Sequence, residues 1–150
     1  MKKLFAVFIS LTFIFCAFAE TTQAKPILSD NDVSSFVKNF DKIRAELEKL
    51  EIDIEDAQSL VAMNVAVEKI QNILNKYGIT GKDGFDKIKA IAYAYALEQY
   101  NLALEADPQT AQMVKSLNID PMAEVRKLVA PSDCEIVKKY FDKLVEVFNN

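Results

Sequence analysis

The stretch DGFDKIKAIAYAYALEQYNLALEAD, residues 83–107, decides the fold of this chain. Its apolar side chains recur at steps of three and four residues, which is the period of an α-helix. A helix that is apolar on two faces needs other elements to cover both of them. We therefore predict a long helix here that lies at the centre of the molecule. Alanines separate its two apolar stripes, which are Ile88, Ile91, Tyr95 and Leu102, and Tyr93, Leu97, Tyr100 and Leu104.

Two further helices are predicted before the central one. The first starts near Ser29 or Asp30, whose side chains can accept hydrogen bonds from the free N–H groups of a first turn. The second follows an acidic break at 51–54 and carries an apolar stripe from Leu60 to Tyr77. It ends at Gly78, because glycine readily adopts the left-handed conformation that follows a last helical turn. Thr80 and Asp83 resemble a capping box for the start of the central helix.

Two short helices and one long helix are predicted after the central one. Asp107-Pro108 and Asp120-Pro121 each combine a capping side chain with a proline suited to a first turn, and predict helices at about 108–117 and 121–129. A capping box predicts the start of the last helix, with the residues Ser132 and Glu135. Its apolar stripe follows a heptad pattern: Cys134, Val137, Phe141, Leu144 and Phe148.

Residues 29–150 are therefore predicted to form one all-α domain, an antiparallel helical bundle of four long helices plus two short ones. No Pro/Gly/Ser-rich linker divides them, and a chain of this length can bury a core without disulfides. Residues 20–28 form a short lead before the first helix.

Residues 1–19 have the three-part pattern of a secretory signal peptide. Lys2 and Lys3 precede an apolar run at 4–15, which is shorter than the ~20 residues that a spanning helix needs. The small residues at 17 and 19 place cleavage before Glu20, with Ala24 as a later alternative. Lipidation of Cys16 and an uncleaved anchor are the competing interpretations. We predict export to a bacterial periplasm or the medium, with no stable membrane anchor after cleavage.

The charge of the chain disfavours some partners. Removing Lys2 and Lys3 with the signal peptide would change the formal net charge from −4 to −6. Binding to nucleic acid or to an anionic membrane usually depends on clustered Lys and Arg, so neither is expected. Cleavage would also leave Cys134 as the only cysteine, so no intramolecular disulfide could form.

The residue inventory disfavours an enzyme. The chain has no histidine and no tryptophan, and it lacks a glycine-rich phosphate loop. We predict no catalytic residues and no cofactor, although a pair of carboxylates could still serve as acid and base. For Cys134, burial as a small apolar side chain is the main interpretation, and an intermolecular disulfide or a redox role is the alternative.

Two acidic segments were considered as calcium sites, and neither is predicted to bind a metal. Residues 46–56 hold six carboxylates and one lysine, but such runs usually form a solvated surface, and acids are favoured at a helix start. Residues 30–32 have the Asp-Asn-Asp opening of a calcium loop. However, Ser35 stands where the turn glycine belongs, and Asp41 replaces the closing glutamate.

The central helix carries the one group of residues predicted to bind a ligand. Polar side-chain tips crowd onto this apolar element, and the candidate ligand-binding residues are Tyr93, Tyr95, Gln99 and Tyr100, with Asn101 beside them. One interpretation is ordinary packing with hydroxyls at the rim. The other is a cavity for a small molecule, with Met63, Met113 and Met122 as adaptable walls.

Two functions follow from these observations. The first is a non-catalytic exported protein that acts as an interaction or adaptor module for a protein partner, which predicts an exposed apolar patch or groove. The alternative is a carrier of a small apolar or aromatic ligand in a cavity beside the central helix, which predicts an enclosed cavity. No motif in the chain is specific enough to assign a function by resemblance.

Overall fold

The computed structural model describes residues 24–50, 60–118 and 120–149, and every regular element in them is an α-helix. The predicted all-α class is confirmed. Residues 1–23, with the predicted signal peptide and its cleavage site, and residues 51–59 of the acidic segment lie outside the described part. The helices are α2 (Asp30–Leu47), α3 (Leu60–Lys76), α4 (Gly84–Ala106), α5 (Pro108–Ser116), α6 (Ala123–Leu128), α7 (Pro131–Lys139) and α8 (Phe141–Asn149).

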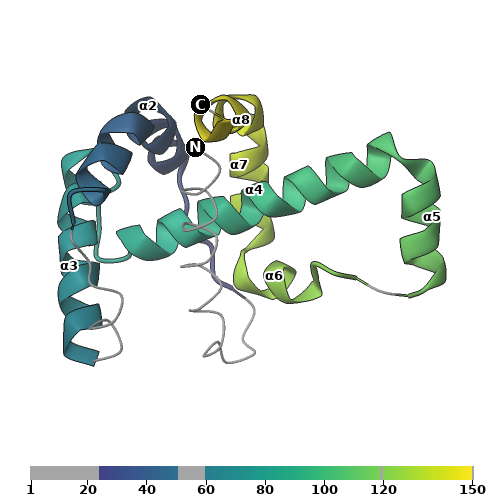
Figure 1. The fold of residues 1–150 in the computed structure, drawn as a ribbon, viewed down its shortest axis with the longest axis horizontal. Helices are drawn as coiled ribbons and strands as arrows, with labels where there is room; N and C mark the ends of the chain where they lie inside the picture. Colours follow the sequence, from purple (N-terminus) through teal and green to yellow (C-terminus); the bar gives the residue numbers. More distant parts are fainter. Residues whose placement is uncertain (1–23, 51–59, 119, 150) are drawn as a thin grey trace.

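The predicted bundle of four long antiparallel helices is not confirmed. In the described residues three helices are long, and the predicted last helix is divided at Tyr140, whose backbone angles (φ −107°, ψ 7°) leave the helical region. The break turns the chain, so that α7 packs mainly on α4 while α8 packs mainly on α2. Figure 1 shows α3 and α7 running across α4 instead of alongside it.

Helix caps explain where several helices begin. Ser29 accepts a hydrogen bond from the Asp32 N–H and forms a capping box with it, and Asp107 accepts from the N–H groups of Gln109 and Thr110. The capping boxes predicted for α4 and α7 are wrong. Helix α4 follows Asp83 without a side-chain cap, and α7 follows Ala130 without one.

The core surrounds the first half of α4. Its buried residues in this half are Gly84, Ile88, Ala90, Ile91, Ala94, Tyr95 and Leu97. Aromatic rings from α2, α4 and α8 meet there, with Phe148 contacting Phe36, Phe40 and Tyr95 at centroid distances of 6.1, 5.4 and 4.8 Å. Beyond Leu97 no residue of α4 is fully buried.

The lead before α2 is tied to α7 by a buried carboxylate. Asp133, 1% exposed, accepts hydrogen bonds from the backbone N–H groups of Ile27 and Leu28, at 3.1 and 3.2 Å. A carboxylate removed from water needs such donors. Asp133 therefore connects segments more than a hundred residues apart in the sequence.

An arm extends from this core. It consists of the end of α4, from Gln99 to Ala106, and of α5, which contains no buried residue. Figure 1 shows α5 at the far end of α4, away from α2, α3, α7 and α8. Three large apolar side chains on the arm are exposed: Leu102 (39%), Met113 (56%) and Leu117 (60%). None of the described helices is long and apolar enough to cross a membrane.

Two aspartate–lysine pairs at the start of α2 provide a matched test of burial. Asp32 and Lys87 form an ion pair at 3.0 Å with side chains 6% and 12% exposed, whereas Asp30 and Lys139 pair at 3.2 Å with side chains more than half exposed. Lys87→Met should lower the free energy of unfolding by about 3 kcal/mol, because Asp32 would remain buried without its counter-ion. Lys139→Met should cost less than about 1 kcal/mol. Urea denaturation measures both, and equal losses would contradict this assignment.

Candidate functional site

An open groove lies where the arm leaves the core. It has a volume of about 590 Å³, and its lining comes from α4, from α8 and from the residue before α6. The lining residues are Ala96, Gln99, Tyr100, Leu102, Ala103, Met122, Phe141 and Val145. In α4 the positions 96, 99, 100 and 103 recur at steps of three and four residues, so they share one face of the helix.

The lining of this groove is mainly apolar and carries no charged side chain. Ala96 and Ala103 contribute small side chains from α4, and Phe141 and Val145 form the wall from α8. Among the lining residues only Tyr100 has a titratable side chain. The groove thus offers a mainly apolar surface, and no Cys, Asp, Glu or Lys side chain is among its lining residues.

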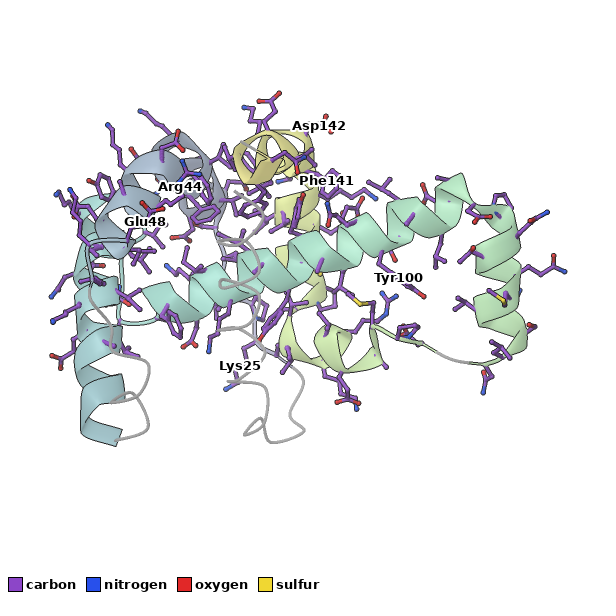
Figure 2. The ribbon with its side chains drawn as sticks, in the orientation of Figure 1. Lys25, Arg44, Glu48, Tyr100, Phe141 and Asp142 are labelled. Atoms are coloured by element: carbon purple, nitrogen blue, oxygen red, sulfur yellow. The ribbon has the colours of Figure 1, made fainter. Side chains whose placement is uncertain are left out.

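Tyr100 brings the one unsatisfied polar group into the groove. Figure 2 shows its side chain projecting from α4 toward the side on which α5 and α6 lie. The hydroxyl oxygen is buried, and no hydrogen-bond partner for it is present among the described residues. A buried hydroxyl without a partner costs free energy, so a bound group that offers a donor or acceptor would recover it.

Tyr95 lies in the core beneath the groove and does not line it. It is 4% exposed, it stacks on Phe141 with ring centroids 5.2 Å apart, and its hydroxyl accepts a hydrogen bond from Gln99 Nε2 at 2.8 Å. Burial is the main cause that raises the pKa of Tyr95 above its usual value. Tyr95 thus supports the Phe141 wall and positions the Gln99 amide.

The candidate residues therefore separate into three places. Gln99 and Tyr100 line the groove, Tyr95 packs beneath it, and Tyr93 packs against the core away from the groove lining. Asn101 is partly exposed and is not part of the lining. Of the methionines proposed as walls, Met122 lines the groove and Met113 is exposed on α5, while the side chain of Met63 lies outside the described part.

Sequence reasoning missed the α8 wall and the two alanines. Phe141 and Val145 are four residues apart, which places them on one face, but the sequence pattern assigned Phe141 to a core stripe. Ala96 and Ala103 are seven residues apart on α4. Seven residues are close to two helical turns, so this spacing indicates that both small side chains lie on the same face of α4.

Three of the acidic residues in the calcium candidates, Asp30, Asp32 and Glu46, form ion pairs with lysines. Asp30 pairs with Lys139 and Asp32 with Lys87, while Glu46 pairs with Lys76 and accepts a hydrogen bond from the Tyr77 hydroxyl at 2.7 Å. The hydrogen bond from Lys76 is the first cause that keeps the pKa of Glu46 below its usual value. Within the described ranges no group of three or more Cys, Asp or Glu side chains could hold a metal ion.

The two tyrosines give opposite expectations for removal of a hydroxyl. Tyr95→Phe should lower the free energy of unfolding by about 1 kcal/mol, because it removes the hydrogen bond from Gln99. Tyr100→Phe should leave stability unchanged or raise it by up to about 1 kcal/mol, since its hydroxyl is buried without a partner. Chemical denaturation of both variants measures the difference. A larger loss for Tyr100→Phe would show that its hydroxyl has a partner in the protein.

Cys134 should react slowly with alkylating reagents in the folded protein. Its side chain is partly buried against the core. Burial, and after it the negative charges of Asp133 and Glu135, raises the pKa of the thiol above its ordinary value. The reactive thiolate should therefore appear at higher pH in the folded chain than in urea. Peptide-resolved mass spectrometry of the iodoacetamide reaction against pH measures this, and a folded-state midpoint below that in urea would contradict it.

No protein-family model matches this chain, and comparisons with curated proteins and with solved structures find no similar protein.

Proposed function

We propose that this protein is an exported, non-catalytic interaction module of a bacterial cell envelope, and that it binds a helical segment of a protein in the groove between α4, α6 and α8. The observation that carries the proposal is the open, uncharged apolar groove itself. An amphipathic helix buries its apolar side chains in a groove of this kind, with anchors at steps of three and four residues.

The shape of the groove favours a protein segment over a small molecule. The groove is open to solvent and not an enclosed cavity, so a segment of a larger chain can contact it. The small side chains of Ala96 and Ala103 allow a helix backbone to approach α4 closely. Tyr95, one of the residues that the carrier alternative would place in a cavity, packs against the rings of Phe141 and Phe148.

The chemistry of the groove favours binding without catalysis. Tyr100 alone among the lining residues can exchange a proton, and no acid or amine stands beside it in the lining. General acid–base catalysis needs a titratable group positioned against the reacting atoms. The Tyr100 hydroxyl is better suited to fixing the register of a bound segment through one hydrogen bond.

The pattern of residues 1–19 supports the envelope location. The segment has the order of features found in secretory signal peptides: two lysines, an apolar run of about a dozen residues, and two small residues. Mass spectrometry of protein isolated from producing cells would show the first residue of the chain. Under this proposal it is Glu20, and an intact N-terminus at Met1 in the bulk of the protein would contradict export with cleavage.

A photo-crosslinking residue in place of Leu102 tests the occupant of the groove. Leu102 lines the groove and is partly exposed, so the replacement should contact whatever binds there. We expect one discrete protein adduct after illumination of living cells. The same residue in place of the exposed Lys82, before the start of α4, is the matched control and should give none.

Adding Ala103→Lys identifies adducts that depend on the groove, because a lysine there would place an unpaired charge among apolar side chains. Under the proposal the Leu102 adduct disappears in this background. An adduct of small-molecule mass would favour the carrier instead. No adduct at Leu102, or a protein adduct that Ala103→Lys leaves unchanged, would contradict the proposal.

A further inference from the structure

Helix α5 presents an exposed ridge that has the properties expected of a groove occupant. The ridge consists of Gln109, Met113, Ser116 and Leu117, whose spacing of four, seven and eight residues from the first places them on one helix face. All four are exposed, and Met113 and Leu117 are 56% and 60% exposed. Leu117 is the capping residue directly after α5, and its backbone angles remain helical.

The α5 ridge and the groove agree in charge. None of the four ridge residues and none of the eight lining residues is charged, in a chain where 27% of residues are. Two copies carry the same sign of charge, a formal net charge of −4 each as full chains and −6 each after the proposed removal of Lys2 and Lys3, so they repel one another. Contact between these two uncharged faces removes no ion of the ridge or of the lining from water.

The two surfaces also agree in hydrogen bonding. The buried Tyr100 hydroxyl in the groove has no partner among the described residues. Gln109 carries an exposed side-chain amide on the ridge, which can both donate and accept. A ridge seated in the groove would bury Met113 and Leu117 against apolar walls, and the amide would pair with the hydroxyl once the Tyr100 side chain turns to expose it.

We propose that the α5 ridge of a second copy occupies the groove, and that the first copy returns its own ridge to the groove of the second. This inference rests on the function proposed above, since it names the partner of the same groove. The two contacts are equivalent if a two-fold axis passes between the groove and α5. Figure 1 shows α5 at the end of the arm, and such an axis would exchange the two positions.

Two variants with opposite charge test the pairing. Ala103→Lys puts a positive charge in the groove, and Met113→Glu puts a negative charge on the ridge. The protein as isolated from cells should sediment as a concentration-dependent dimer, and each variant alone should weaken the dimer by about tenfold or more. An equimolar mixture should restore it, because the mixed dimer has one unchanged contact and one contact between opposite charges.

Asn72→Glu, at an exposed position of α3, is the control for added charge and should leave the dimer unchanged. Far-ultraviolet circular dichroism confirms that each variant remains helical. A monomeric unmodified protein, a single variant that still dimerises, or a mixture that stays monomeric would overturn the inference. If the unmodified protein is monomeric while the Leu102 position crosslinks a different protein, the groove function stands and the second copy is excluded as its occupant.

Discussion

The structure depends on the burial of the first half of α4 from more than one side. Ile91 and Ala94 are at most 1% exposed, and Ile88, Tyr95 and Leu97 at most 5%, so neighbouring helices must cover several faces of one element. Helix α4 contacts α3, α5, α6, α7 and α8. Apolar burial is the dominant favourable contribution to folding, so the need to cover the apolar faces of α4 determines where the surrounding helices lie. The transverse packing of α3 and α7 in Figure 1 is one way to cover a single helix on different sides.

The groove exists because this burial stops at Leu97 while the helix continues to Ala106. Apolar residues persist past the point where neighbouring helices cover them, since Tyr100, Leu102 and Ala103 follow on the same continuous helix. The aromatic contacts of Tyr95 with Phe141 and Phe148 hold α8 at this boundary. Phe141 therefore has two roles, because it packs on a core tyrosine and also forms a wall of the groove.

The sequence was sufficient for the helices but not for their arrangement. Periodicity indicated α2, α3 and α4, the two Asp-Pro pairs indicated α5 and α6, and the caps at Ser29 and Asp107 are those predicted. Nothing local marks the break at Tyr140, because the heptad stripe continues through it and the turn depends on α7 and α8 packing on different helices. Gln99 and Tyr100 were predicted as ligand-binding residues from their polar tips, and both line the candidate groove. Ala96 and Val145 were not, because their contribution is shape and depends on which helices meet.

The exposed side chains of the arm have an energetic cost that argues for their use. Fully burying a leucine or methionine side chain contributes about 1.5–3 kcal/mol, and the arm forgoes much of this at Met113 and Leu117. Helix α5 packs chiefly on the end of α4 and buries no residue, so we expect it to open at a lower free energy than the core helices. When the arm makes a contact it loses conformational entropy, and this loss reduces the net free energy of binding. In the proposed dimer each arm provides both the ridge of one contact and a wall of the other. The entropy lost in ordering that arm is therefore paid once for two contacts.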